Sequence, residues 1–204
     1  MSFYEDHFLP HLINLACGIK PVRKQREKVV PLAEGRVLEV GMGPGLNIPF
    51  YDPARVEFVW GLEPAEAMRK KATRLLAQAP FEVEWLGLPG EEIPLDDNSA
   101  DTVLLTFTLC TIPDWFTALG QMRRVLKPTG KLVFCEHGLA PDAGVRKWQR
   151  RLNPIWNKLA GGCHLNRPIP DYLQQAGFTI QAMESGYIPG PKIAAFNYWG
   201  VATA

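Results

Sequence analysis

A glycine-rich loop and one downstream carboxylate are the sharpest signs of chemistry in this sequence. The loop, Gly41-Met42-Gly43-Pro44-Gly45, directly follows an apolar run, and its glycines let the backbone turn tightly and approach a ligand closely. Pro44 removes a backbone donor, which argues against a pyrophosphate cradle and for a ligand with a less demanding anion. Glu63 comes 18 residues after Gly45 and ends a second apolar run. A carboxylate there can accept both ribose hydroxyls of an adenosine.

A second set of reactive side chains lies further along the chain. His137 follows an apolar run, while Cys163, His164 and Arg167 share a short polar segment. A histidine there can remove a proton from a substrate, and Arg167 can favour an anion. A hydrogen-bonded structural histidine is the alternative for His137. Because adjacent side chains need not face each other, Cys163 and His164 do not by themselves predict a nucleophile and its base.

Alternating strand and helix patterns must position these residues. Apolar runs predict strands at 36–40, 56–62, 81–86, 101–109 and 131–136. Helical spacing predicts helices over 64–78 and 114–126, with a shorter one ending at Gly177. Residues 178–183 and 193–199 predict a closing β-hairpin. Near the N-terminus, 9–17 has the spacing of a short amphipathic helix, and the basic run 20–28 is interpreted as a solvated face near a helix.

This order of elements predicts an α/β fold: a Rossmann-like, seven-stranded, mostly parallel sheet with helices on both faces. Such sheets bind ligands at the carboxyl ends of their strands, near the point where the strand order reverses. Residues 138–170 interrupt the alternation and predict a small substrate-cap insertion over the sheet. We expect residues 1–204 to form one domain, with an N-terminal helical segment at 1–30.

Composition excludes several other classes of protein. The 204 residues are 47% hydrophobic and 21% charged with a formal net charge of +1, as in an ordinary globular protein with no general attraction to polyanions. No secretory signal or membrane-spanning run is visible. Cys17, Cys110, Cys135 and Cys163 form no CxxC pair, so their spacing predicts neither a zinc site nor a disulfide framework. A reducing, cytoplasmic location fits them. The oligomeric state is left open.

Four segments at the correct intervals resemble the class I S-adenosylmethionine (SAM)-dependent methyltransferases, above all the quinone-biosynthesis type: VLEVGMGPG, GLEP, DTVLLTFTLC and RRVLKPTGKLVF. The resemblance implies SAM as cofactor, S-adenosylhomocysteine as product and no metal. It implies that Glu39, Gly41, Gly43 and Gly45 frame the methionine part, that Glu63 holds the ribose, and that Met68 or a neighbour such as Ala65 packs on the adenine. The other cofactor residues expected from it are Asn47, Pro64, Gly90, Glu91, Thr106 and Leu109. Leu88 or Pro89 stands where the family usually carries an Asp toward the adenine, so Gly90 and Glu91 are expected to act through their backbone.

A narrower resemblance extends over nearly the whole chain. LCTIPD, CEHG and PIWNKLAGGCHLNR are similar to the thiol methyltransferases of the methyltransferase-like group, whose animal members also carry a hydrophobic anchor that is not seen here. It implies a small thiol or sulfide as methyl acceptor. We expect His137, His164 and Arg167 to be catalytic, and Cys110, Cys163 and Asn166 to bind the substrate. Trp148 recurs at helical spacing with Trp156, so it either builds a helix face or walls an apolar substrate pocket.

Three functions remain in competition. The first is methyl transfer to a thiol or sulfide, which needs little activation because a thiolate is a strong nucleophile. The second is C- or N-methylation of a quinone-like or lipid-amine substrate, and the third is SAM binding without turnover. Nucleic acid is not an expected partner. The segment Leu109-Cys110-Thr111-Ile112-Pro113 lacks the Asn/Asp-Pro-Pro-aromatic sequence used on bases, and no basic aromatic groove is apparent.

Overall fold

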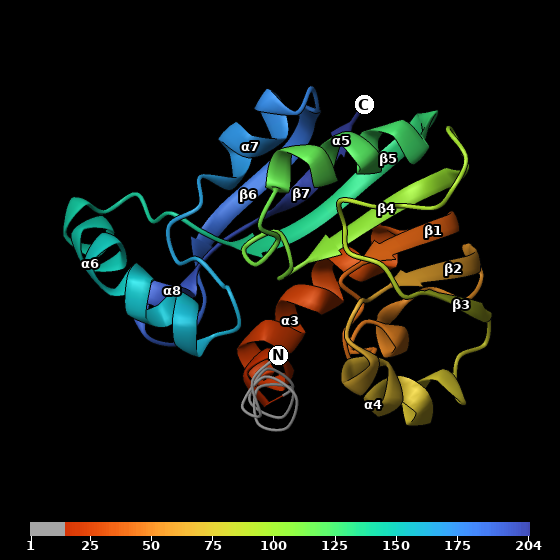
Figure 1. Ribbon diagram of the computed structural model, residues 1–204, viewed down its shortest axis with the longest axis horizontal. Coiled ribbons are helices and arrows are strands. Elements are labelled where there is room, and N and C mark those ends of the chain that lie inside the picture. The colour runs from red at the N-terminus through yellow and green to blue at the C-terminus, as the bar shows by residue number, and fades with distance from the viewer. Residues whose placement is uncertain (1–14) are drawn as a thin grey trace.

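The computed structural model describes residues 15–204 and shows one seven-stranded sheet in the order β3-β2-β1-β4-β5-β7-β6 (Figure 1). The first five strands run parallel, whereas β7 is antiparallel to both β5 and β6. This confirms the mostly parallel, Rossmann-like fold. The strands are β1 (Gly35–Val40), β2 (Val56–Leu62), β3 (Glu82–Leu86), β4 (Ala100–Thr106), β5 (Leu126–His137), β6 (Thr179–Tyr187) and β7 (Phe196–Thr203).

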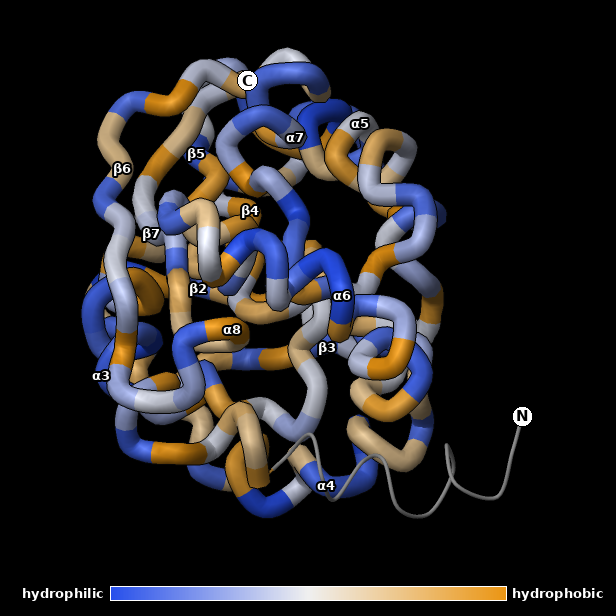
Figure 2. The backbone as a smooth tube through the Cα atoms, turned by 90° about the vertical axis from the view of Figure 1, so that its left-hand side faces the viewer, coloured by the Kyte–Doolittle hydropathy of each residue, from blue (hydrophilic) through white to orange (hydrophobic). Residues whose placement is uncertain are grey.

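Helices cover the sheet because alternate strand residues point to opposite faces and both faces are apolar. On β1, Leu38 packs in the cluster that includes α5 and α7, while Val37 packs in the cluster that includes the end of α3. In Figure 2 the hydrophobic colouring recurs along the central strands β4 and β5. The helices are α3 (Lys20–Val29), α4 (Glu66–Leu76), α5 (Trp115–Val125), α6 (Ala143–Leu159), α7 (Ile169–Gln175) and α8 (Lys192–Ala195), with short 3-10 turns η1 (Val30–Leu32) and η2 (Ile48–Phe50).

The strand order places one edge of the sheet for ligand binding. The chain moves outward from β1 to β2 and β3, and then returns to place β4 and β5 on the other side of β1. The reversal therefore lies between β1 and β4, and a crevice at their carboxyl ends is the expected ligand site. The glycine loop leaves β1 at this point and is tied to β2, because Gly41 N donates to Leu62 O over 2.8 Å.

Some predicted boundaries were wrong. Strand β5 begins at Leu126 and not at 131, because Leu126 pairs with Ala100 of β4; the pairing is irregular over 127–130 and resumes at Lys131. Ile193 lies in α8 and not in the closing hairpin. The basic run 20–28 forms most of α3 itself, and most of the predicted helix 9–17 lies outside the described residues.

The segment 138–170 contains α6, which projects beyond the end of the sheet in Figure 1. Within residues 15–204, no helix has both the length and the apolar character needed to cross a bilayer.

Candidate active site

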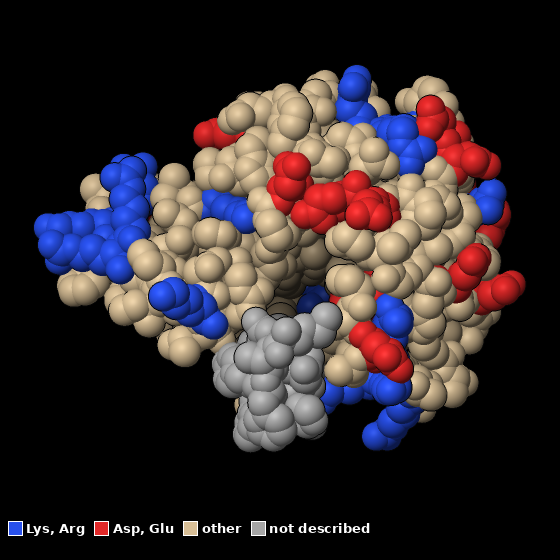
Figure 3. Space-filling view, in the orientation of Figure 1, with Lys and Arg blue, Asp and Glu red and all other residues tan. Residues whose placement is uncertain are grey.

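A cavity of about 360 Å³ opens at the carboxyl ends of the central strands. In Figure 3 the middle of the molecule is hollowed, with acidic side chains along one rim. The lining residues come from α3 and the turn before it, from the ends of β1, β2 and β4, from the loops that follow the first four strands, from the start of α4, and from the segment after α6. Those used below are Cys17, Arg26, Gly41, Gly43, Glu63, Pro64, Met68, Gly90, Glu91, Thr106, Phe107, Thr108, Thr111 and Gly161.

The glycine loop has the backbone that its sequence requires. Gly41, Gly43 and Gly45 have φ values of 70°, 56° and 78°, a region that glycine enters without penalty. A Cβ on Gly41 would lie 2.2 Å from Thr108 Cγ2, so Gly41 is needed for packing against the loop after β4. A Cβ on Gly43 would find its nearest protein atom at 3.9 Å, because Gly43 faces the cavity. Gly41 is therefore required for packing within the protein, whereas Gly43 keeps space open in the cavity.

Glu63 stands at the end of β2 and is buried, with its carboxylate held by two backbone groups. Gly43 N donates to its Oε2 over 3.0 Å, and Ala65 N donates to its Oε1 over 2.9 Å. Burial raises the pKa of this carboxyl, and the two hydrogen bonds oppose that rise. Glu63 thus fixes the glycine loop to the end of β2 while it also lines the cavity.

A buried polar network lies behind one wall of the cavity. Asn47 Nδ2 donates to Glu39 Oε1 and to Thr106 Oγ1, both over 2.9 Å, and Tyr51 Oη donates to Glu39 Oε2 over 2.6 Å. Burial raises the pKa of Glu39 to about 7, against the opposing hydrogen bond from Tyr51 and the charge of Arg26. Glu39 and Asn47 therefore support the cavity from behind its wall.

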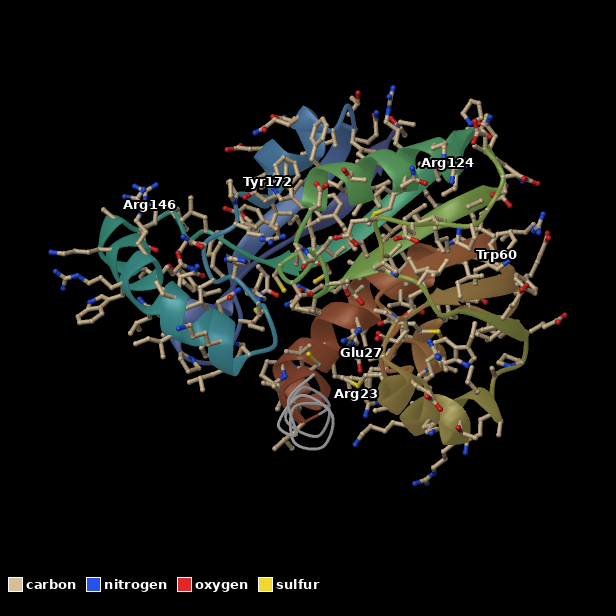
Figure 4. The ribbon with its side chains drawn as sticks, in the orientation of Figure 1. Arg23, Glu27, Trp60, Arg124, Arg146 and Tyr172 are labelled. Carbon is tan, nitrogen blue, oxygen red and sulfur yellow. The ribbon has the colours of Figure 1, made fainter. Side chains whose placement is uncertain are left out.

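Arg26 is a site residue that the sequence interpretation missed. It is 6% exposed, lines the cavity, and donates through Nη1 to Asn47 Oδ1 over 2.5 Å and to Thr106 Oγ1 over 2.9 Å. Its Nε is buried without a hydrogen-bond partner among the described residues. Arg23 and Glu27 instead pair on the exposed side of α3 (Figure 4). The burial of Val22, Arg26 and Val29 follows helical spacing, and that spacing was the available signal.

The predicted cofactor residues divide into two groups. Gly41, Gly43, Glu63, Pro64, Met68, Gly90, Glu91 and Thr106 line the cavity. Glu39, Gly45, Asn47 and Leu109 lie behind its wall. Leu109 is fully buried in the main hydrophobic cluster, so it supports the site through packing.

Three of the other predicted residues meet in a compact cluster, which we call the sulfur–imidazole cluster: Cys110, His137 and Cys163. His137 Nε2 lies 3.1 Å from Cys163 Sγ, and Cys163 Sγ lies 3.7 Å from Cys110 Sγ. The hydrogen bond between Cys110 and Cys163 lowers the pKa of Cys163, with the charge of His137 as a further cause, while that bond and burial raise the pKa of Cys110. Burial lowers the pKa of His137, but the charge of Cys163, the hydrogen bond to it and the charge of Glu136 together raise that pKa above its ordinary value.

The segments that carry this cluster are held by several polar contacts. Glu136 Oε1 accepts from Thr108 N over 2.7 Å, and His164 N donates to Cys110 O over 2.9 Å. Arg167 is buried and donates through Nη1 to the carbonyl oxygens of Leu109 and Ile112. The loop after β4 is thereby fixed to the end of β5 and to the segment after α6.

One further contact reaches a sulfur atom of the cluster from α6: Trp156 Nε1 donates to Cys163 Sγ over 3.4 Å.

Several predicted substrate-side residues lie elsewhere. Trp148 is 53% exposed on α6, beside Arg151, and does not line the cavity. Arg146 of the same helix also points outward in Figure 4. His164 places its Nδ1 and its Nε2 each 3.1 Å from an asparagine amide, those of Asn153 and Asn157, and burial lowers its pKa. Asn166 is half-buried. The contacts of His164 and Arg167 account for both side chains structurally.

Comparison with known proteins decides the family. A family model described as a methyltransferase domain matches residues 38–134. Thiol S-methyltransferase TMT1A of Homo sapiens is 32% identical over 178 residues, which cover 81% of this chain and 71% of that protein. The chain belongs to the SAM-dependent methyltransferase family.

Other members of the methyltransferase family extend the comparison. Thiol S-methyltransferase TMT1B of Rattus norvegicus is 33% identical over 74% of this chain, and the match spans 63% of that protein. Demethylmenaquinone methyltransferase of Clavibacter sepedonicus is 30% identical over 58% of this chain and 48% of its own length. The structure of geranyl diphosphate methyltransferase in complex with SAM superposes with a TM-score of 0.70 at 12% identity, covering 89% of this chain and 84% of that one, which shows the shared fold.

Proposed function

We propose that this methyltransferase-family chain binds SAM in the cavity and transfers its methyl group to a small thiol or sulfide. The observation that carries the proposal is the position of the sulfur–imidazole cluster. Thr108 and Thr111, on either side of Cys110, line the cavity, and so does Gly161, two residues before Cys163. Cys110, His137 and Cys163 do not line the cavity themselves; they lie behind the part of its wall that their neighbours in the chain form. The identity to two thiol S-methyltransferases supports the same acceptor class.

The cofactor residues keep their expected roles in this proposal. Glu63 accepts the ribose hydroxyls through lone pairs that its two backbone donors leave free. The open side of Gly43 admits the methionine part, and Met68 packs on the adenine beside the Gly90 and Glu91 backbone. We add Arg26 as the partner of the SAM carboxylate, because it lines the cavity and a nearly buried guanidinium is suited to an anion.

Methyl transfer from a sulfonium is an in-line displacement, so the protein contributes chiefly by positioning the two reactants. A thiol must ionise first, and an ordinary thiol pKa of about 8.5 makes this a modest requirement. The expected base, His137, has its Nε2 directed at Cys163 Sγ. Its role in proton removal stays a prediction, as does the influence of Arg167 on an anionic acceptor.

The test is release of S-adenosylhomocysteine with a panel of acceptors: a small alkyl thiol, hydrogen sulfide, a catechol, a quinol and an amine. We expect turnover with the thiol or the sulfide. Turnover with the quinol or the amine alone would replace this acceptor class by the C- or N-methyltransferase alternative, which the demethylmenaquinone relative favours. SAM binding with no turnover on any acceptor would favour a binding protein.

The four cysteines bear on the cellular compartment in which the protein works. All four cysteines lie in the described part of the chain as free thiols, which supports a reducing compartment such as the cytoplasm. A small molecule is the proposed partner, and nucleic acid is not.

A further inference from the structure

The sulfur–imidazole cluster has the dimensions of a metal site. A tetrahedral zinc ion with Zn–S bonds of about 2.3 Å and Zn–N bonds of about 2.0 Å sets two sulfur ligands about 3.8 Å apart and a sulfur and a nitrogen about 3.5 Å apart. Here the two sulfur atoms are 3.7 Å apart, His137 Nε2 lies 3.1 Å from Cys163 Sγ, and all three ligand atoms lie within 4.8 Å of one another. We propose that Cys110, His137 and Cys163 bind a zinc ion.

The three ligands arrive on separate segments that the fold holds together. Cys110 follows β4, His137 ends β5, and Cys163 follows α6. Contacts from Glu136, Arg167 and the His164 backbone fix the Cys110 loop from two sides. The indole N–H of Trp156 points at Cys163 Sγ and would stabilise a metal-bound thiolate. Outer contacts of this kind orient metal ligands and tune affinity.

The burial of both cysteines favours a role as metal ligands over a role as separate reactive thiols. Cys110 is 2% exposed and Cys163 is 9% exposed, so neither thiol is placed to react freely at the surface. A disulfide would need the two sulfur atoms to approach from 3.7 Å to about 2.05 Å and would leave His137 without a partner. A shared ion would bond to both sulfur atoms and to the imidazole at once.

The donor set also leaves room for a fourth ligand. Zinc held by two cysteines and one histidine keeps one position for water or substrate in catalytic sites. Because Thr108, Thr111 and Gly161 line the cavity next to the ligands, a small thiol entering there is the natural occupant; this step rests on the proposed function. On coordination the thiol proton leaves to solvent. The sulfur electron pair then forms the new S–CH₃ bond, while the methyl–sulfonium bond breaks and its electrons remain on S-adenosylhomocysteine.

The test measures metal directly and does not depend on turnover. The protein is purified with a phosphine reductant, stripped with a chelator, and titrated with zinc sulfate and, separately, cobalt chloride. We expect one zinc per chain by elemental analysis, and with cobalt the sulfur-to-metal charge-transfer bands and visible bands of a tetrahedral site. Cys110→Ala, His137→Ala and Cys163→Ala should each lose these signals. Cys135→Ala is the matched control, because Cys135 is equally buried on β5 but stands outside the cluster, and it should keep them.

A graded variant separates a metal ligand from a structural thiol. Trp156→Phe keeps the packing but removes the N–H on Cys163, so zinc affinity should fall by about 10–100-fold at unchanged stoichiometry. Absence of zinc and cobalt binding by the reduced wild type overturns the proposal, and so does binding that persists in Cys110→Ala and Cys163→Ala. Full thiol methylation by metal-free enzyme overturns the fourth-ligand step, whereas zinc binding without methylation of any thiol overturns the proposed function and leaves the metal site standing.

Discussion

At the residue scale, Glu63 both lines the cavity and holds the glycine loop to the end of β2, and its sequence position predicts only the first of these. Its place at the end of β2 predicted contact with a ribose, but the spacing says nothing of its hydrogen bonds to Gly43 N and Ala65 N. The same limit applies to the sulfur–imidazole cluster. Its residues were chosen from the sequence, yet the cysteines are 53 positions apart and no local motif reveals that they meet. Spacing rules find metal sites whose ligands pair locally, as in CxxC, and this cluster has no such pair.

Glu63→Ala should weaken SAM binding by roughly 2–3 kcal/mol while the protein remains folded, because a charge-assisted pair of hydrogen bonds to the ribose is lost. Calorimetric titration with SAM, together with circular dichroism of the free variant, measures both effects. Glu63→Gln is the control: its amide keeps one acceptor and should bind SAM better than the alanine variant. Wild-type affinity in Glu63→Ala would rule out the ribose contact.

Arg26→Gln should weaken SAM binding by about tenfold or more, since one charge-assisted contact to the carboxylate is removed. Decarboxylated SAM should bind the variant and the wild type with similar affinity, which separates a carboxylate contact from general damage to the network. Arg23→Gln, on the exposed side of α3, is the matched control and should behave as wild type. An equal loss for both ligands would mean that Arg26 only supports Asn47 and Thr106.

The buried carboxyl of Glu39 makes stability depend on pH. Its pKa is about 7 in the folded protein against an ordinary 4.5, with Arg26, Tyr51 and Glu63 as the charged or titratable groups around it. Between these values the folded state binds more protons than the unfolded state, so the free energy of unfolding falls as pH rises through this window. Glu39→Gln should remove about 1–3 kcal/mol of that fall, measured by urea unfolding near pH 5 and near pH 8.

Glu34→Gln is the control for this titration. The hydrogen bonds from Lys131 and Arg55 lower the pKa of Glu34, and the carboxyl is exposed. Its contribution therefore has the opposite sign and is lost as pH falls. An unchanged pH dependence in Glu39→Gln would show that Glu39 is ionised in the folded protein at about pH 5.

At the scale of elements, the glycine loop and the loop after β4 must be considered together. The sequence identified both as site elements, and the structure shows them in contact through Gly41 and Thr108. Phe107, the residue after β4, has a φ of 54°, a strained value for a side chain of this size. Strained backbone persists where the surroundings fix it, here through the hydrogen bond from Phe107 N to Cys135 O. The strand was predicted to continue through 109 because its apolar pattern does. It ends at Thr106, and the long-range contact that holds the turn there cannot be seen in that pattern.

Two glycine variants should separate packing from ligand binding. Gly43→Val should abolish SAM binding, since the side chain would enter open cavity space, and should cost stability only about 1–2 kcal/mol for its positive φ. Gly41→Val should unfold the protein or lower its melting temperature sharply, because its Cβ alone meets Thr108 at 2.2 Å. Thermal melts and SAM titration of both variants give the comparison. Normal SAM binding by Gly43→Val would mean that the cofactor does not use this loop.

At the scale of the whole molecule, the architecture could be predicted from the sequence because each strand and helix has its own local apolar pattern. Buried strands, helix faces and breaks recur in order, and the reversal beside β1 follows from that order. The placement of α6 was harder to foresee. Trp148 suggested a pocket wall by its type and spacing, but the helix turns that side chain to solvent. Helical spacing identifies one face of a helix and does not say what that face meets.

SAM should stabilise the entire fold, because the cavity that holds it is built from both halves of the sheet. At about 100 times the dissociation constant the gain is about 2.7 kcal/mol, visible as a higher melting temperature in a thermal scan. S-adenosylhomocysteine should act similarly, while adenine alone should have a smaller effect. A melting temperature that SAM leaves unchanged at saturating concentration would contradict cofactor binding in this cavity.

The strand order has a consequence for how the molecule is made. β7 lies between β5 and β6, although β6 precedes it in the chain. During translation β6 therefore leaves the ribosome before the strand that joins it to the sheet exists. Until then the edge of β5 is unpaired, including His137, which later pairs with Asn197. A nascent chain that stalls after β5 and before residue 196 presents that open edge to other strands, so a pause between the synthesis of β5 and that of β7 should promote aggregation of this protein.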